Sequence, residues 1–300
     1  VRANEDILFS VEAGEIHALL GENGSGKSTL MNILSGIYQP DAGTIMIRGR
    51  QVAFHAPHDS IAEGIGMIHQ HFKLVENLSA FENILAGTGK GLRLDRKAAA
   101  KKIRTYAERF EMDVALDKLV GQMSVGEKQT VEIMKVLYRG SDILVLDEPT
   151  AVLTPQEIQR LFKILRRMRR EGHAIIFISH KLNEVMELCD RVTVLRRGQT
   201  VGTAKVADVT TDQLVELMVG HSVDLSISRP PVQSDGLCLS VEHLSVQDAE
   251  GLIKLDDVGF DLWHGEILGV AGLAGSGQKE LCEAIAGLVQ NVRGSVRFHQ

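Results

Sequence analysis

The residues with the clearest capacity for chemistry lie in a glycine-rich stretch near the start of the chain. The stretch reads GENGSGKST, residues 21–29, and satisfies the pattern G-x-x-x-x-G-K-[ST] in full. Glycines at these positions let successive backbone N–H groups turn toward a phosphate, and the helix that follows directs its positive end at the same anion. Lys27 adds a cation for the β- and γ-phosphates, while Ser28 offers a hydroxyl to Mg²⁺. The stretch therefore predicts a phosphate-binding loop.

Two adjacent carboxylates end an apolar run further along the chain. The run reads ILVLDE, residues 143–148. Asp147 is placed to hold the Mg²⁺ shell, and Glu148 to polarise a water for in-line attack on a γ-phosphate. An acidic pair that only ends a strand is the alternative, and by itself it fits the sequence equally well. The phosphate-binding loop in the same chain favours catalysis.

A histidine and a glutamine are the next candidates. The run FISHKL places His180 at the end of a predicted strand, where a sensor of the γ-phosphate would lie. The stretch MIHQHF places Gln70 between His69 and His71. Neighbouring histidines can bind a metal, but no carboxylate or cysteine at ligand spacing accompanies them, so we reject a metal site there.

A serine–glycine turn opens a predicted helix in MSVGEKQ, residues 123–129. The N-terminus of a helix attracts anions, so the turn has a geometry suited to phosphate. Within a single domain, however, the turn has no obvious phosphate to bind. The residue types alone therefore do not explain the function of this turn.

Strand-like and helix-like segments alternate through the first part of the chain. Continuous apolar runs predict strands of a parallel sheet that is covered on both faces. The expected strands are 15–21, 44–49, 142–149 and 174–180; the expected helices are 27–36 and 154–172, together with a mainly helical block at 78–140 that is broken near 87–91 and 121–126. The alternation predicts an α/β fold in which the helical block is an insertion.

The chain also repeats itself over a long distance. Shifted by 251 positions, residues 14–45 fall on 265–296 without a gap, and 11 of the 32 aligned pairs are identical. The second loop reads GLAGSGQKE, with Gln278 at the place of Lys27. We therefore expect a tandem duplication: a first domain at 1–220, a linker at 221–235 that includes the proline-rich RPP, and the start of a second, degenerate domain at 236–300. Because the chain opens with Val1 inside strand-like sequence and stops soon after the second loop, we expect a fragment of a longer protein.

Composition restricts the class of protein. The chain has 300 residues, 44% of them hydrophobic and 24% charged, which is enough apolar material for a packed core. The net charge of −6 gives no overall attraction for nucleic acid, and we interpret the arginine run LRRMRR as the solvated face of a helix. Three cysteines without metal or disulfide spacing indicate a reducing compartment. No apolar run approaches the ~20 residues of a membrane helix, and no secretory segment is visible.

In this order, the motifs resemble those of the ATP-binding subunit of ABC transporters. The resemblance covers residues 1–220 nearly completely, and the beginning of a second copy. By this resemblance the ATP-binding residues are Gly21, Glu22, Asn23, Gly24, Ser25, Gly26, Lys27, Ser28, Thr29 and Gln70; the signature motif is Ser124, Val125, Gly126 and Glu127; the catalytic residues are Lys27, Glu148 and His180; and the Mg²⁺ ligands are Ser28, Gln70 and Asp147.

The resemblance implies a fold, a reaction and partners. The fold is a P-loop NTPase of ABC type, with a mixed sheet core, a helical insertion subdomain and a tandem duplication whose second copy is truncated. The reaction is ATP hydrolysis with ATP and Mg²⁺. The duplicated form with a weakened second loop is similar to importers of simple sugars and nucleosides, and GIGMIHQHFKLV and residues 123–157 look closest to the nucleoside branch that works with BMP-type lipoprotein receptors.

For such a subunit the implied partners are integral membrane permease subunits and an extracytoplasmic substrate-binding protein, without nucleic acid. The implied location is the cytoplasmic face of the cell membrane, as a peripheral protein. Two ABC domains, in one chain or in two, dimerise head to tail, so that Ser124 and Gly126 would face a nucleotide on the second loop. That site departs from the family pattern at Val125, where many members have Gly, and at Gln278. The resemblance therefore implies one working and one silent site.

Two other departures concern communication between the sites and adenine binding. Thr154 stands where many ABC proteins carry Asp, and no aromatic residue before Val11 is well placed to stack on adenine.

Two other classes of function were weighed. A soluble tandem ABC ATPase acting on ribosomes or DNA usually keeps both loops intact and carries basic linkers, so Gln278 and the acidic balance speak against it. A kinase acting on a small molecule would have no use for the serine–glycine turn or for the duplication.

Overall fold

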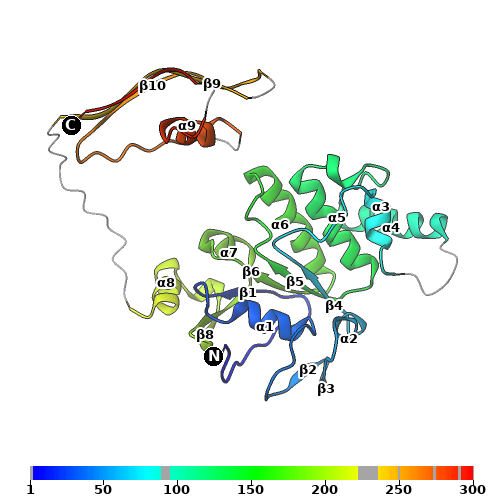
Figure 1. Ribbon diagram of the computed structural model, residues 1–300. Helices are drawn as coiled ribbons and strands as arrows, with labels where there is room; N and C mark the ends of the chain where they lie inside the picture. The colour runs from blue at the N-terminus through cyan, green and yellow to red at the C-terminus, as the bar shows by residue number, and fades with distance from the viewer. Residues whose placement is uncertain are drawn as a thin grey trace. The chain divides into compact units, whose positions relative to one another are not determined.

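The computed structural model describes residues 3–88, 95–221, 236–248, 251–272, 275–289 and 292–299. The chain divides into two compact units, Val1–Val223 and Asp224–Gln300 (Figure 1). The predicted linker at 221–235 lies outside the described residues except for His221. The limits predicted for the two domains therefore stay a prediction.

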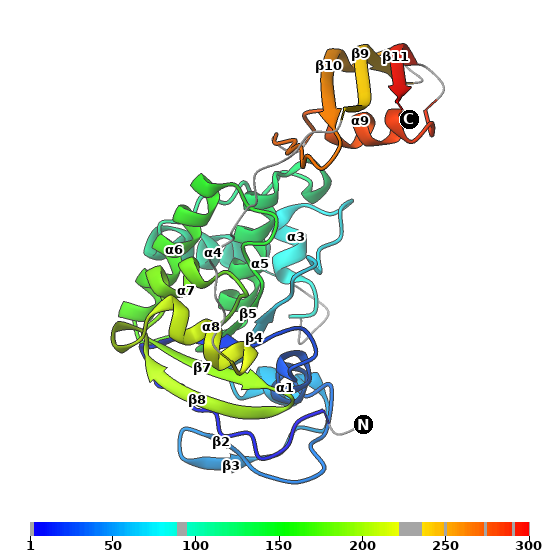
Figure 2. The same ribbon diagram turned by 90° about the vertical axis from the view of Figure 1, so that its left-hand side faces the viewer.

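The first unit is built on a six-stranded sheet in the order β4-β5-β6-β1-β7-β8. Neighbouring strands are parallel from β4 to β7, whereas β8 runs antiparallel to β7, so the sheet is mixed as predicted (Figure 2). The strands are β1 (Ile16–Leu20), β4 (Ile65–Ile68), β5 (Ile143–Asp147), β6 (Ala174–Ile178), β7 (Arg191–Arg196) and β8 (Gln199–Lys205), and a separate hairpin contains β2 (Ile45–Ile47) and β3 (Arg50–Val52).

Successive side chains of the central strands pack into two different hydrophobic cores. In β1, Ala18 and Leu20 belong to one cluster of buried residues, while Leu19 belongs to another. Successive side chains of a strand point to opposite faces, so a continuous apolar run satisfies both cores at once. Helices surround the sheet of this unit. They are α1 (Lys27–Leu34), α2 (Pro57–Ala62), α3 (Ala80–Leu85), α4 (Arg96–Phe110), α5 (Val125–Tyr138), α6 (Pro155–Arg170), α7 (Leu182–Leu188) and α8 (Thr211–Val219), and short 3₁₀ turns lie at Val120–Gln122 and Val206–Asp208.

The helical block contains α3, α4 and α5, grouped on the side of the unit away from the β2–β3 hairpin (Figures 1 and 2). Its second break is longer than predicted, because α4 already ends at Phe110 and α5 begins only at Val125. The extra residues have a role, since the backbone carbonyls of Leu116 and Lys118 accept hydrogen bonds from Phe81 and Ala80 at 2.9 and 3.0 Å. The segment between α4 and α5 is therefore hydrogen-bonded to the start of α3.

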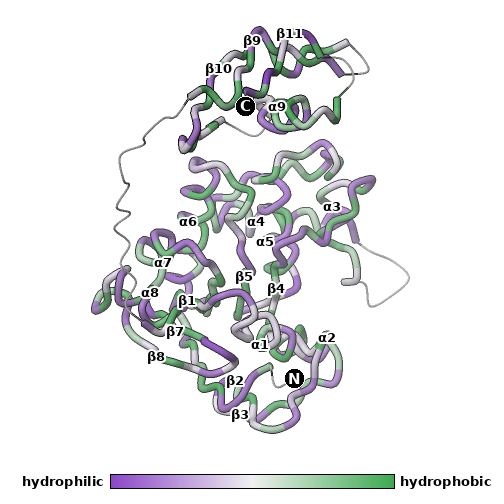
Figure 3. The backbone as a smooth tube through the Cα atoms, turned by 60° about the vertical axis from the view of Figure 1, so that its left-hand side comes forward, coloured by the Kyte–Doolittle hydropathy of each residue, from purple (hydrophilic) through white to green (hydrophobic). Residues whose placement is uncertain are grey.

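Helix α6 has the boundaries that its sequence predicts. The Thr154 side chain accepts a hydrogen bond from Glu157 N, and Pro155 occupies the first helical position. Hydrophobic and hydrophilic stretches alternate along the backbone of the first unit (Figure 3). The arginines of α6 form ion pairs with carboxylates outside the helix. Arg169 lies 2.7 Å from Asp190, and Arg167 pairs with Glu111. These pairs agree with the interpretation of LRRMRR as a solvated helix face.

The second unit has a three-stranded antiparallel sheet in the order β10-β9-β11, covered by helix α9 (Gln278–Ile285). The strands are β9 (Leu237–Gln247), β10 (Ile253–Trp263) and β11 (Val292–Phe298). Residues 267–271, which align with β1 in the repeat, form no strand here and are exposed, with Ile267 97% accessible. The described part of this unit contains no counterpart of the parallel strands that flank β1.

Candidate active site

The predicted phosphate-binding loop lies between β1 and α1, the context that its pattern requires. Gly26 forms the N-cap of α1 in the left-handed conformation, with φ 102°. A Cβ at this position would overlap the Asn4 side chain and lie 2.9 Å from the carbonyl oxygen of Ala3. Glycine is needed here for both reasons, because the N-terminal segment passes directly over the loop.

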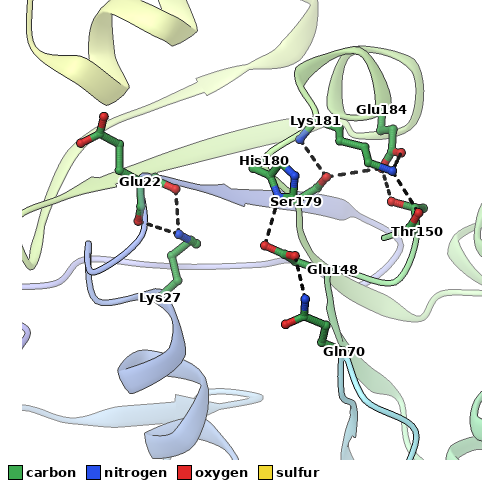
Figure 4. Close-up of polar contacts among 10 residues, drawn as sticks. Glu22, Lys27, Gln70, Glu148, Thr150, Ser179, His180, Lys181 and Glu184 are labelled. Atoms are coloured by element: carbon green, nitrogen blue, oxygen red, sulfur yellow. Dashed lines mark hydrogen bonds and ion pairs between the residues drawn. The ribbon is translucent and has the colours of Figure 1, made fainter. Parts of the chain in front are cut away.

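Lys27 reaches back over the opening of the loop. Its Nζ donates hydrogen bonds to the carbonyl oxygens of Gly21 at 2.7 Å and Glu22 at 2.9 Å (Figure 4). Burial lowers the pKa of the ammonium group, and the nearby carboxylates of Glu148 and Asp147 oppose that shift. The cation thus lies in the field of the two acidic residues.

Asp147 ends β5, and Glu148 is the first residue beyond it. Glu148 has a left-handed backbone, φ 45°, which is strained for a residue other than glycine. Its N–H donates to the carbonyl of Ile178 at 3.0 Å, which holds it to the end of β6. Burial raises the pKa of the Asp147 carboxyl, and the negative charge of Glu148 adds to the effect.

Gln70 and His180 meet at the side chain of Glu148. Gln70 Nε2 donates to Glu148 Oε2 at 3.2 Å, and His180 Nδ1 lies 3.0 Å from Glu148 Oε1 (Figure 4). The sheet order explains the convergence, because β4, β5, β6 and β1 are adjacent and parallel. Their carboxyl ends reach the same edge, which is where open α/β sheets bind ligands.

A cavity of about 490 Å³ opens at this edge. It is lined by Gly21, Glu22, Asn23, Gln70, Glu148, His180 and Met218. Six of these seven are residues that the sequence singles out. Met218 was missed, because a methionine at helical spacing in α8 has no signal beyond that of a core residue.

Several features of the loop suit a bound polyphosphate. Ser25 Oγ is buried without a hydrogen-bond partner, and nothing lies within 4 Å of the space that a Cβ on Gly24 would fill. Ser28 lies in the first turn of α1 and is exposed. No group of three His, Cys, Asp or Glu residues in the described ranges could hold a metal ion. Any Mg²⁺ here would therefore depend on few protein ligands and on substrate phosphates.

The predicted signature residues lie elsewhere. Ser124 is the N-cap of α5 and forms a capping box with Glu127, whose pKa is lowered chiefly by the hydrogen bond from Lys118. Gly126 N donates to Glu157 Oε1 at 3.1 Å, and a Cβ on Gly126 would meet that carboxylate at 2.5 Å. Neither these residues nor Val125 line the cavity.

The second loop shares the geometry of the first where it is described. Gly277 forms the N-cap of α9 with φ 91°, and α9 begins at Gln278 as α1 begins at Lys27. The Gln278 amide folds back over Gly272, where its nitrogen would lie 2.7 Å from a Cβ on that glycine. A neutral amide therefore takes the place of the lysine ammonium. Residues 273–274 of this loop lie outside the described ranges.

Comparison with known proteins identifies the type of domain that contains the site. The family model described as ABC transporter matches residues 4–151, which include the loop, Gln70, the serine–glycine turn and both carboxylates. The chain therefore contains an ABC transporter domain at residues 4–151. Its resemblance to ATP-binding subunits of that family is thereby confirmed.

Several relatives are named as import ATP-binding proteins. Across 99% of the chain, it is 46% identical to the nucleoside import ATP-binding protein NupA of Lactococcus lactis, 45% to the guanosine import ATP-binding protein NupO of Bacillus subtilis, and 44% to the ribose import ATP-binding protein RbsA of Hahella chejuensis. The chain spans 59% of the length of each of these relatives.

The ABC fold is also found among solved structures. An ATP-binding cassette of an ABC transporter in its ADP conformation matches with a TM-score of 0.65 and 24% identity, over 73% of this chain and 93% of the cassette. The predicted fold class, an ABC-type α/β unit with a mixed sheet, is thus confirmed. The second copy of that unit stays a prediction.

Proposed function

We propose that this chain is part of the ATP-hydrolysing, energy-coupling subunit of an ABC importer for nucleosides or simple sugars. The observation that carries the proposal is the convergence of Gln70 and His180 on Glu148, beside the loop that contains Lys27. The names of the relatives add support, because all three are import ATP-binding proteins. They do not favour an ATPase acting on ribosomes or DNA.

In this proposal Glu148 is the general base. Its carboxylate would take the proton from a water that attacks the γ-phosphate in line. Gln70 and His180 each hold one of its oxygens, so the carboxylate is oriented before substrate arrives. His180 also lines the cavity, which supports its proposed role as a sensor of the γ-phosphate.

The loop would hold the phosphates of ATP. Its backbone N–H groups and the Lys27 ammonium would neutralise the charge that develops on the transferred phosphoryl group. Mg²⁺ would be held by Ser28, Gln70 and Asp147, and would supply charge neutralisation at the β- and γ-phosphates. The raised pKa of Asp147 supports this assignment, because a cation relieves the repulsion between Asp147 and Glu148.

We further propose one working and one silent ATP site in the full-length protein. The working site would contain the Lys27 loop and the silent site the Gln278 loop, each completed by the signature turn of a partner ABC domain. Gln278 lacks the cation that would stabilise the transition state, which is why that site would not turn over.

The proposed partners are permease subunits in the membrane and an extracytoplasmic substrate-binding protein. No helix in the described ranges has the length and apolar character to cross a bilayer. We propose a peripheral position at the cytoplasmic face, where the protein would contact the permease rather than the substrate. The identity of the transported substrate would then depend on the permease and the substrate-binding protein.

The proposal is tested with the full-length protein and its permease. Mg²⁺-dependent release of free phosphate from ATP is expected, whereas a kinase would leave a phosphorylated acceptor. Uptake of labelled nucleosides and pentoses is then compared between the parent strain and a strain lacking the gene. Loss of nucleoside uptake alone would select the nucleoside branch, and loss of pentose uptake alone the sugar branch. The proposal would be wrong if neither uptake changed and the protein sedimented with ribosomes.

A further inference from the structure

A buried carboxylate behind the active site joins two segments of the chain. Glu184, on α7, is 8% exposed. Its Oε2 accepts hydrogen bonds from Thr150 Oγ1 at 2.6 Å and from Ser179 Oγ at 3.3 Å. Its Oε1 lies 3.2 Å from the Nζ of Lys181. Thr150 and Ser179 are buried as well, with 1% and 3% exposure.

Lys181 closes these contacts into a ring. Its Nζ donates to the carbonyl oxygen of Thr150 at 2.9 Å, and its backbone N–H donates to Ser179 Oγ at 3.0 Å (Figure 4). The segment after β5 and the segment after β6 are therefore connected through a charged, fully hydrogen-bonded network. Such networks fix geometry when every member is satisfied.

The network lies next to the catalytic pair in sequence and in space. Thr150 is two residues beyond Glu148, while Ser179 and Lys181 flank His180. Glu184, Thr150 and Ser179 do not line the cavity, so they have no direct route to a nucleotide. Any influence they have on the reaction must act through the placement of Glu148 and His180.

We propose that Glu184 is a positioning residue that holds Glu148 and His180 at hydrogen-bonding distance. The proposal rests on the proposed function, since it assigns Glu184 a part in ATP turnover. A misplacement of about 1 Å at a reacting group can cost roughly 100-fold in rate. Release of one anchor of the network is therefore expected to reduce turnover more than nucleotide binding.

Glu184→Gln is the sharpest test, because an amide has nearly the same shape but cannot replace both oxygens. If the amide oxygen accepts from Thr150 and Ser179, its NH₂ group faces the Lys181 ammonium, and two donors meet. If the amide is turned, both hydroxyls lose their acceptor. Neither orientation satisfies the network.

Glu187→Gln is the matched control. Glu187 lies on the same helix, its side chain is 43% exposed, and it pairs with Arg166 at 3.1 Å. An exposed ion pair of this kind contributes little to stability, so the control loses a glutamate charge without loosening the buried network.

The full-length wild-type protein and the variants are compared in phosphate release and in binding of a fluorescent ATP analogue. Glu184→Gln is expected to lower kcat at least about tenfold, with KM and analogue affinity within about threefold of wild type. Thr150→Val, which keeps the shape and removes the hydroxyl, is expected to lower kcat as well. Adding Thr150→Val to Glu184→Gln should cost little more, because both changes act on the same hydrogen-bond network.

The proposal is overturned if kcat of correctly folded Glu184→Gln equals that of Glu187→Gln. It is equally overturned if the variant only melts at a lower temperature while turnover per folded molecule is unchanged. Should Glu184→Gln fail to fold, Thr150→Val decides by the same criteria. Absence of phosphate release from the wild type would instead contradict the proposed function, so the two failures are distinguishable.

Discussion

The imidazole Nδ1 of His180 lies 3.0 Å from Oε1 of Glu148, although the two residues are 32 positions apart in the chain. They follow adjacent parallel strands, β6 and β5, so their meeting is a consequence of the sheet order. The contact gives the proposed general base a partner that holds one of its two carboxylate oxygens. The chemistry assigned to Glu148 therefore depends on His180 as well.

Glu148→Gln separates binding from turnover. The amide keeps the size of the side chain but cannot accept a proton from water, so turnover is expected to fall by about 100-fold or more. ATP affinity is expected to remain within a few-fold of wild type, because the phosphates are held by the loop. Phosphate release and equilibrium binding of an ATP analogue measure the two quantities.

A carboxylate far from the cavity supplies the control for that variant. Glu63 pairs with Arg50 at 3.1 Å on the surface, and Glu63→Gln is expected to leave turnover unchanged. Unchanged turnover in Glu148→Gln would remove Glu148 from its assigned role.

Two glycines of the loop are expected to respond differently to the same substitution. Gly26→Ala places a methyl group against Asn4 and Ala3 at a left-handed residue, so both overlap and backbone strain oppose it. Gly24→Ala meets only the backbone strain, about 1–2 kcal/mol, because nothing lies within 4 Å. Urea unfolding should show the larger loss of stability for Gly26→Ala, and equal losses would show that the contact with Asn4 is not rigid.

The sequence predicts the motif residues of the site better than the residues that surround and position them. Glu148 and His180 end predicted apolar strands, and parallel strands bring such ends together, so their meeting is predictable. The strand before Gln70, β4, is not among the predicted strands. The position of Met218 in the cavity wall is not predictable, because the pattern of an amphipathic helix does not show which end of the helix reaches a cavity. Glu184 was missed for a similar reason, since a glutamate in a short helix reads as a surface residue until its burial is known.

The repeat shows a different limit. The alignment of residues 14–45 with 265–296 predicts a second strand like β1, yet residues 267–271 are irregular and exposed. A strand of a parallel sheet needs a parallel neighbour to pair with, and the described strands of the second unit pair only with one another, in antiparallel fashion. By contrast, Gly277 forms a left-handed N-cap as Gly26 does, because this conformation depends only on local glycine chemistry.

Asp147→Asn is expected to stabilise the protein at neutral pH. The pKa of Asp147 is raised in the folded state by burial and by Glu148, so the native protein binds the proton more tightly than the unfolded chain. Stability is therefore lost as pH rises through the native pKa of Asp147. At pH 7 the charged carboxylate destabilises the folded state, and replacement by the neutral Asn removes this effect. Thermal unfolding should give a higher Tm for Asp147→Asn at pH 7, and the difference should disappear below about pH 4.

The exposed Asp117 provides the comparison for this pH dependence. Asp117→Asn is expected to change stability by less than about 0.5 kcal/mol at either pH. A lower Tm for Asp147→Asn at pH 7 would contradict the repulsion inferred between Asp147 and Glu148. In both variants Mg²⁺ is left out of the buffer, because a bound cation would mask the effect.

The most direct test of the account compares the two loops in the full-length protein. Steady-state phosphate release is measured for Lys27→Ala and for Gln278→Ala, each alone. Loss of a cation at the transferred phosphate is expected to reduce turnover in Lys27→Ala by about 100-fold or more, whereas Gln278→Ala should remain within about twofold of wild type. Undiminished phosphate release in Lys27→Ala would contradict the assignment of the working site to the first loop.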